Sequence, residues 1–140
     1  MKRQREIDES YLKMAKTWSD LSYCNRKKVG ALIVKNGMII SDGFNGTPSK
    51  SKPNICEDLE GNTHWWVLHG EANAILKCAK HGHSCDEATL YQTHSPCKDC
   101  SKLILQAGIK RVVYIEDYKD LDGVELLLES GVKVDKIIIN

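Results

Sequence analysis

The chain has 140 residues, a formal net charge of +1 and a hydrophobic fraction of 41%, which fit one domain over residues 1–140. Proteins that bind the phosphate backbone usually carry a strong basic excess, so we expect no nucleic-acid partner. No apolar run is long enough to span a membrane, and no secretory signal follows the charged N-terminus. We therefore expect no membrane partner and a cytoplasmic location, where six cysteines indicate metal binding or catalysis rather than disulfides.

The first half of the chain predicts a helix, a hairpin and a long loop. Apolar residues spaced by four, four and three predict an amphipathic helix over residues 6–20. The basic cluster Arg26-Lys27-Lys28 is interpreted as a solvated turn. An apolar run over residues 29–34 predicts a buried strand, and Asn36-Gly37 predicts a hairpin turn into a return strand over residues 38–41. Residues 45–65 are polar and contain Gly and Pro, and loops of this length are usually functional.

The second half alternates helices and strands. Helices are expected from near Gly70, from Pro96 to a stop at Gly108, and over residues 121–128. Strands are expected over residues 88–91 and 112–115, and two short apolar segments, 132–134 and 137–139, close the chain. This alternation predicts an α/β sandwich with a partly parallel sheet.

Two motifs, His69-Gly70-Glu71 and Pro96-Cys97-Lys98-Asp99-Cys100, supply three zinc ligands and one free carboxylate. Three protein ligands leave a zinc position open, which is typical of a catalytic site. Both motifs are expected at helix N-termini at one end of the sheet, and cysteines three residues apart share a helix face. Alone, the Cys-x-x-Cys pair fits a redox pair or a structural zinc site. Combined with His-x-Glu, it is the signature of zinc-dependent nucleobase deaminases.

The chain resembles the cytidine/deoxycytidylate deaminase superfamily, and within it the deoxycytidylate (dCMP) deaminases most closely. Besides the zinc motifs, the resemblance is carried by segments 28–34, 71–75 and 106–110, and by the more discriminating loop Gly43-Phe44-Asn45-Gly46-Thr47-Pro48. It implies a three-layer αβα sandwich of the cytidine deaminase-like fold, with a five-stranded mixed sheet, and a homo-oligomer, either a hexamer or a dimer.

The resemblance also implies a reaction and a set of site residues. His69, Cys97 and Cys100 would hold one catalytic Zn²⁺, and Glu71 would shuttle protons while zinc-bound hydroxide attacks C4 of dCMP, giving dUMP and ammonia. The substrate would be contacted by residues matched from the family, which are Asn45, Gly70, Tyr118 and Lys80. Relatives usually carry Ala in place of Gly70, although Gly occurs in free-base cytosine deaminases.

Three features stay open. Cys24 and Cys56 match positions that bind a second, structural zinc in some relatives, with His64 as a third ligand; the alternative is a pair of free thiols. His94 could line the pocket, but we expect it to cover the rim. Other functions in the same chemistry are a free cytosine, guanine or tRNA adenosine deaminase, and a different class is a non-catalytic zinc-stabilised module.

Overall fold

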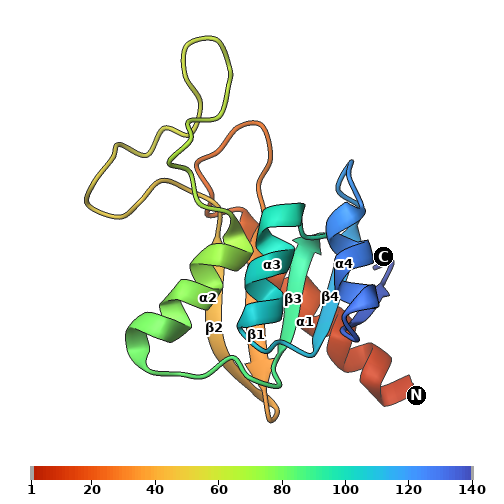
Figure 1. Ribbon diagram of the computed structural model, residues 1–140. Helices are drawn as coiled ribbons and strands as arrows, with labels where there is room; N and C mark the ends of the chain where they lie inside the picture. The colour runs from red at the N-terminus through yellow and green to blue at the C-terminus, as the bar shows by residue number, and fades with distance from the viewer. Residues whose placement is uncertain (1, 140) are drawn as a thin grey trace.

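A computed structural model describes residues 2–139 and contains one five-stranded sheet (Figure 1). The strands stand in the order β2-β1-β3-β4-β5. Strand β1 pairs antiparallel with β2 and β3, whereas the β3–β4 and β4–β5 pairs are parallel. Their bounds are β1 Gly30–Lys35, β2 Met38–Phe44, β3 Thr89–His94, β4 Arg111–Glu116 and β5 Lys133–Lys136. The mixed sheet that the sequence predicts is therefore confirmed.

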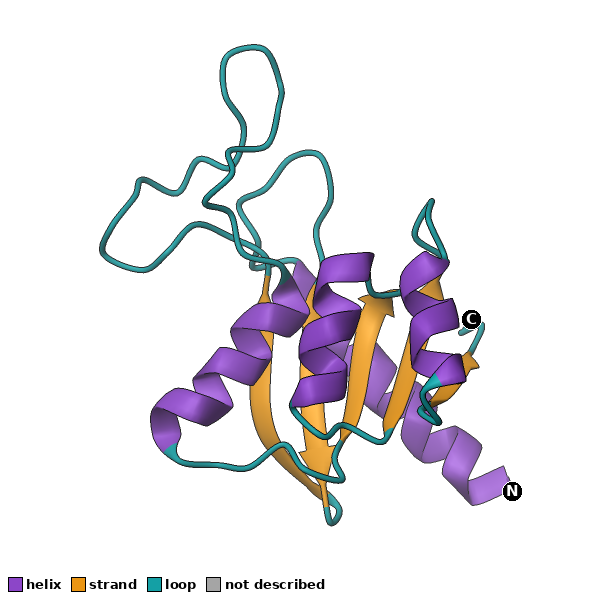
Figure 2. Cartoon of the chain, in the orientation of Figure 1, coloured by secondary structure: helices purple, strands orange, loops and turns teal. Residues whose placement is uncertain are grey.

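Four helices cover the two faces of this sheet and complete three layers (Figure 2). Helix α1 (Lys2–Ser19) lies on one face, and α2 (Gly70–His81), α3 (Lys98–Gln106) and α4 (Asp122–Glu129) lie on the other. The predicted αβα sandwich is confirmed. None of the helices within residues 2–139 has the length and apolar character that a membrane span requires.

Several element boundaries differ from those predicted. Helix α1 begins earlier than residue 6, and the ion pairs Arg3–Glu6 and Arg5–Glu9 lie along its solvent side. Helix α3 begins at Lys98 rather than at Pro96, because Cys97 has an extended backbone and caps the helix. Of the two apolar segments that close the chain, only 132–134 overlaps a strand, because β5 ends at residue 136.

The core divides into two layers because successive strand residues point to opposite faces. Ile33, Leu90 and Val112 are fully buried beneath α2, α3 and α4. Their neighbours in the sequence point the other way and pack under α1 with Leu12 and Ala15; these neighbours are Leu32, Tyr91 and Val113. The sheet thus presents an apolar surface on both sides.

A buried ion-pair network joins α1 to the sheet. Both carboxylate oxygens of Asp8, which is 2% exposed, accept hydrogen bonds from Arg111 of β4 at 2.9 and 2.8 Å. The Tyr91 hydroxyl donates to Asp8 at 2.7 Å, and the Arg111 Nε–H donates to Asp135 of β5 at 2.9 Å. One side chain of α1 is therefore held by two strands, β3 and β4, and β5 holds the Arg111 side chain through Asp135.

A close backbone contact sets the position of α2 on the sheet. A Cβ atom on Gly43 of β2 would lie 2.5 Å from the carbonyl oxygen of Gly70 and 2.7 Å from the amide nitrogen of Ala74. Only glycine permits this approach. The first turn of α2, which follows His69, is consequently fixed against the end of β2.

We expect Asp8→Ala to lower the free energy of unfolding by about 3–5 kcal/mol at pH 7, because it removes the bidentate partner of the buried Arg111 and leaves only Asp135. Burial opposes ionisation of Asp8, but Arg111, Tyr91 and Gln4 outweigh it, so the pKa of Asp8 lies below its ordinary value. The stabilisation is therefore fully present above the unfolded-state pKa of about 4 and is lost as the pH falls through the lower folded-state pKa.

Urea denaturation of the parent protein and of Asp8→Ala between pH 7 and pH 3 measures this effect. Glu9→Ala is the matched control, because it removes an exposed ion pair of the same helix, which contributes less than about 1 kcal/mol. A stability difference between Asp8→Ala and the parent that grows towards acid pH would contradict the network's assigned role.

Candidate metal centre and active site

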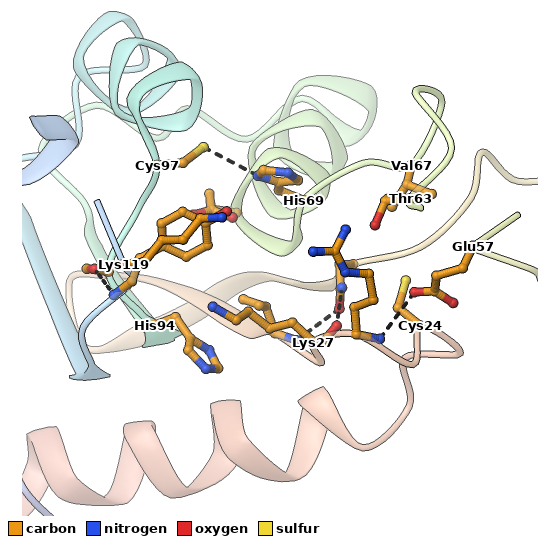
Figure 3. A pocket seen from close by; sticks show the side chains of 15 residues that line it. Cys24, Lys27, Glu57, Thr63, Val67, His69, His94, Cys97 and Lys119 are labelled. Atoms are coloured by element: carbon orange, nitrogen blue, oxygen red, sulfur yellow. Dashed lines mark hydrogen bonds between the residues drawn. The ribbon is translucent and has the colours of Figure 1, made fainter. Parts of the chain in front are cut away.

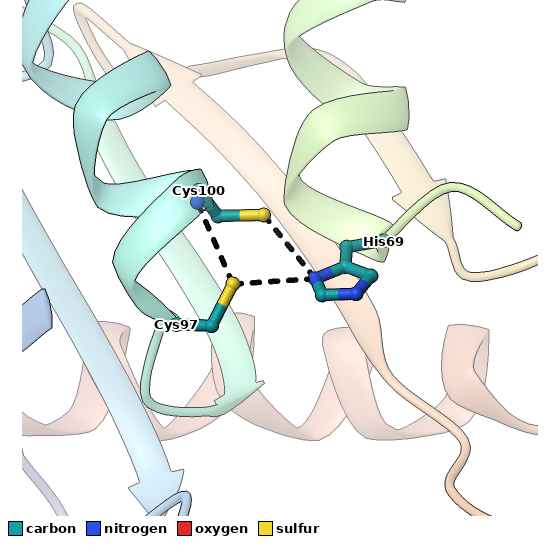
Figure 4. A group of neighbouring side chains, drawn as sticks. All are labelled: His69, Cys97 and Cys100. Atoms are coloured by element: carbon teal, nitrogen blue, oxygen red, sulfur yellow. Dashed lines mark hydrogen bonds between the residues drawn. The ribbon is translucent and has the colours of Figure 1, made fainter. Parts of the chain in front are cut away.

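The side chains of His69, Cys97 and Cys100 converge at the N-termini of α2 and α3 (Figure 4). Both sulfur atoms face the same ring atom, with Cys97 Sγ 3.4 Å and Cys100 Sγ 3.3 Å from His69 Nδ1. His69 stands at the N-cap of α2, and Cys97 at the N-cap of α3, so each helix start presents its ligand atoms to the other. The structure therefore brings together the three residues that the sequence predicts as zinc ligands.

The spacing of these atoms fits a tetrahedral zinc ion. Bonds of about 2.3 Å to sulfur and about 2.0 Å to nitrogen would separate the two ligand atoms by about 3.5 Å. The observed sulfur–nitrogen distances of 3.3–3.4 Å are close to this value. A set of two thiolates and one imidazole is also a donor set that zinc prefers.

The pKa values of His69, Cys97 and Cys100 are shifted in different directions. Hydrogen bonds from Cys100 and His69 lower the pKa of Cys97 to about 4, despite partial burial. The resulting Cys97 thiolate raises the pKa of His69 and, together with burial, raises that of Cys100. The lowered pKa favours the thiolate form of Cys97, which is the form that binds a metal.

Glu71 is the second residue of α2 and lies near the three predicted zinc ligands. Its side chain is 4% exposed and lines the same cavity as His69 and Cys97. Burial raises the pKa of Glu71 above its ordinary value, while its own backbone N–H, His69 and Gln92 oppose this change. A carboxyl with a raised pKa, close to a metal centre, is suited to accept and return a proton.

The cavity has a volume of about 390 Å³ and a basic wall (Figure 3). His69, Glu71 and Cys97 belong to its lining, and so do three cationic side chains, Arg26, Lys27 and Lys119. The interpretation of Arg26-Lys27-Lys28 as only a solvated turn is wrong, because Arg26 and Lys27 lie in the cavity wall. Arg26 and Lys27 come shortly before β1, which lies next to β3 in the sheet. This position was the signal in the sequence that could have placed them in the cavity wall.

Two of the predicted substrate contacts, Asn45 and Tyr118, line the cavity. The Asn45 side chain accepts from the Val29 amide at 2.9 Å and donates to the Lys27 carbonyl at 2.7 Å. It therefore holds the segment that carries the cationic side chains. The Tyr118 ring lies under Lys27, whose Nζ is 4.2 Å from the ring centroid.

His94 lines the cavity, so the expectation that it covers the rim is wrong. Its Nδ1 is 2.9 Å from the hydroxyl of Thr93, which itself accepts from the Gly30 amide at 3.3 Å. The other ring nitrogen is 3.2 Å from Glu116. Burial and the nearby Lys27 lower the pKa of His94 below its ordinary value, although Glu116 opposes them.

Gly70 and Lys80 lie on α2 but differ in their relation to the cavity. Gly70 is buried in the first turn, and a Cβ there would lie 3.1 Å from the Val29 carbonyl oxygen, which is a tight contact. Lys80 is exposed, about 15 Å further along the helix axis, and is not in the cavity wall. The contact between Lys80 and substrate stays a prediction.

The expectation that this chain forms no disulfide is wrong, because a disulfide joins Cys24 to Cys56. Glu57 lies beside this pair and accepts hydrogen bonds from the Asn25 and Arg26 amides at 3.1–3.3 Å. His64 is not part of that group; its ring stacks on Trp66. The disulfide ties the 45–65 loop to the basic segment, and loop residues Glu57 and Thr63 line the cavity.

Comparison with known proteins agrees with this site. Residues 5–116 match the family model described as the cytidine and deoxycytidylate deaminase zinc-binding region. The deoxycytidylate deaminase of Enterobacteria phage T4 is 36% identical over 165 residues, which cover 88% of this chain and 86% of that protein. ComE operon protein 2 of Bacillus subtilis (strain 168) is 43% identical over 121 residues, which cover 83% of this chain but only 63% of that protein.

A solved structure gives the same result for the fold. The dCMP deaminase from the cyanophage S-TIM5, crystallised in complex with dCMP and dUMP, superposes with a TM-score of 0.91 at 50% identity. The superposition covers 94% of this chain and 97% of that one. The fold is the cytidine deaminase-like fold, and the resemblance to dCMP deaminases is confirmed. The chain belongs to the cytidine and deoxycytidylate deaminase family.

Proposed function

We propose that this chain is a zinc-dependent enzyme that hydrolyses dCMP to dUMP and ammonia. One observation carries the proposal: His69 and Cys97 of the candidate metal group, the buried Glu71 and three cationic side chains line a single cavity. The phage T4 and S-TIM5 relatives bear the name of this activity, and they support the same substrate here.

Glu71 would be the group that moves protons. Zinc, held by His69, Cys97 and Cys100, would supply Lewis acidity that lowers the pKa of a water molecule towards neutrality. Glu71 would accept a proton from that water as the water oxygen bonds to C4, and would deliver this proton to the adjacent ring nitrogen. It would then carry the proton of the new C4 hydroxyl to the amine, so that the C4–N bond breaks, ammonia leaves and a C4 carbonyl remains. Its burial keeps bulk water from competing for the proton.

The cationic wall would select a substrate with a phosphate. Arg26, Lys27 and Lys119 provide positive charge within the cavity that contains Glu71. Guanidinium and ammonium groups bind phosphate oxygens through charge-assisted hydrogen bonds. A free base such as cytosine or guanine has no group that would use this wall, so a nucleotide substrate is favoured.

The remaining alternatives are less well supported. A tRNA adenosine deaminase would require an extended basic surface, and the net charge of +1 does not favour one. A purely structural zinc module would have no use for a carboxylate that is buried beside the ligands without being one of them.

Two further features remain proposals. The second zinc site at Cys24, Cys56 and His64 would require reduction of the disulfide, because zinc binds thiolates. A homo-oligomer, dimeric or hexameric, would cover exposed apolar side chains such as Trp65, which is 89% exposed. The cytoplasm remains the expected location.

We expect the parent protein, purified with reductant and zinc, to hold its catalytic zinc tightly, and His69→Ala, Cys97→Ser and Cys100→Ser each to lose it, because three ligands are the minimum of such a site. Elemental analysis after gel filtration measures the zinc content. Cys78→Ser is the control, since this buried thiol of α2 lies outside the candidate metal groups. Cys97→Ser protein with an unchanged zinc content would contradict the assignment.

We expect Glu71→Gln to keep its zinc but to lose about 10²–10⁴-fold in kcat with dCMP, because general acid–base catalysis typically contributes that much. Loss of ultraviolet absorbance follows the reaction, with dCMP, cytosine, cytidine and guanine tested in parallel. Glu129→Gln, on the exposed side of α4, is the control. Parent protein that turns over cytosine but not dCMP would overturn the proposed substrate.

We expect Arg26→Met to raise KM for dCMP about tenfold or more and to change kcat much less, because a hydrogen bond to an ionised group contributes about 1.5–3 kcal/mol. The ratio of kcat/KM for dCMP to kcat/KM for deoxycytidine should fall by a similar factor. Lys28→Met provides a matched control, since this neighbouring cation is exposed and outside the cavity wall. Equal effects of Arg26→Met and Lys28→Met would show that general charge, rather than a phosphate site, is responsible.

A further inference from the structure

We propose that Glu57 is a positioning residue that fixes the main chain of Arg26, and with it the guanidinium group that would bind the substrate phosphate. This inference rests on the proposed function, in which Arg26 belongs to the cationic wall. Glu57 and Arg26 both line the cavity, although 31 positions separate them in the chain. Glu57 lies beside Cys24 in the cavity wall (Figure 3).

The Glu57 carboxylate binds two successive main-chain amides of the basic segment. Its Oε2 atom accepts from the Asn25 amide at 3.1 Å and from the Arg26 amide at 3.2 Å, and Oε1 lies 3.3 Å from the Asn25 amide. Successive N–H groups that point at one oxygen atom form an anion site. The contact therefore holds the backbone that carries the Arg26 side chain and leaves the guanidinium group itself available.

The turn that carries Glu57, residues 56–64, is itself well held. The Asp58 side chain accepts from two amides of this turn, at 2.9 and 3.0 Å. The disulfide between Cys56 and Cys24 joins the turn to the basic segment. The carboxylate is thus presented from a structured turn, next to a covalent link, and can act as a fixed support.

Arg26 depends on this support more than the neighbouring cation does. Lys27 has its Nζ 4.2 Å from the centroid of the Tyr118 ring, and its carbonyl accepts from Asn45 at 2.7 Å. Within residues 2–139, no ion pair involves Arg26, and the hydrogen bond found for it is the one from its amide to Glu57. A fixed backbone reduces the freedom that a long side chain must lose when it binds a ligand.

The charge of Glu57 opposes its own positioning effect on phosphate binding. A carboxylate in the wall repels a phosphate, and it also occupies two amides that could bind phosphate oxygens. If Glu57 acted only through its charge, its removal would lower KM for dCMP. If it positions Arg26, its removal raises KM, so the two roles predict opposite changes.

The test measures steady-state kinetics with dCMP, without reductant, so that the Cys24–Cys56 disulfide stays closed. Glu57→Met keeps the approximate length of the side chain and removes both its acceptor atoms and its charge. We expect KM to rise about fivefold, less than in Arg26→Met, because a positioning residue cannot contribute more than the group it positions. The value of kcat should stay within about twofold and zinc content should not change, since binding common to the ground and transition states is lost.

Two further variants separate the acceptor atoms from the charge. Glu57→Gln removes the charge but keeps one acceptor oxygen for the amides, so KM should stay within about twofold of the parent value. Glu57→Asp keeps the charge but withdraws the oxygens by one methylene, so KM should rise. Glu60→Ala is the matched control, because it removes the same charge from an exposed position in the same turn, and it should leave KM unchanged.

Coupling to Arg26 is tested in a second background. In Arg26→Met the guanidinium group is absent, so adding Glu57→Met should change KM less than about twofold, as expected for two residues that act through one contact. A fivefold rise that recurs undiminished in this background would refute the role of Glu57, because the effect would not act through Arg26.

The other outcomes separate this inference from the proposed function. Parent protein inactive on dCMP would refute the proposed function, and the role of Glu57 with it. Parent protein active on dCMP, together with a KM for Glu57→Met at or below the parent value, would refute the role of Glu57 alone. A KM for Glu57→Gln as high as that of Glu57→Met would also refute it, because the acceptor oxygen would then have no effect.

Discussion

The candidate metal centre of this protein depends on the N-termini of two helices, α2 and α3, which meet at one end of the strands. Helices α2 and α3 belong to separate parts of the chain, yet both sulfurs of α3 face the Nδ1 atom of the histidine that caps α2. The glycine contact between β2 and α2 fixes one helix, and the short connection from β3 to Cys97 fixes the other. A shift of either helix would separate these sulfur and nitrogen atoms, so the packing of the helices on the sheet sets the geometry of the candidate metal centre.

The same edge of the sheet brings opposite charges to a small cavity. Its lining contains Glu71 and Cys97, whose carboxylate and thiolate forms are negative, and also Arg26, Lys27 and Lys119. Asn45 holds the segment that carries Lys27, because its side-chain amide accepts from the Val29 amide and donates to the Lys27 carbonyl. A substrate that carries both an amine-bearing ring and a phosphate would find groups of suitable charge for each in this lining.

The sequence predicted the features that depend on local patterns. The spacing of apolar residues predicted the helices and strands, and the two motifs predicted that His69, Cys97 and Cys100 lie together. It did not predict features that depend on distant segments. Residues 24 and 56 are joined only because the long loop folds back over the basic segment, and no spacing rule specifies this. The basic cluster was misjudged because its local pattern is that of any solvated turn, while its place in the cavity is set by β1 and Asn45. Strands β2 and β3 continue beyond their apolar runs through polar residues, which include Asp42, Gln92 and Thr93. The strand ends that form the site were therefore the part that the sequence predicted least well.

Within this family the metal motifs cannot by themselves select a substrate, since deaminases of different bases share them. Selection must come from the parts of the cavity that the motifs do not contain. In this chain those parts are the segment before β1, the 45–65 loop and the segment after β4, which together contribute Arg26, Lys27, Glu57, Thr63, Tyr118 and Lys119. These segments are loops fixed by side-chain hydrogen bonds and by one disulfide, whereas the metal ligands are fixed by helices and strands. The residues predicted to carry the reaction are thus fixed separately from those predicted to bind the rest of the substrate. Substitutions in the loops can therefore alter substrate preference without moving the predicted metal ligands or Glu71.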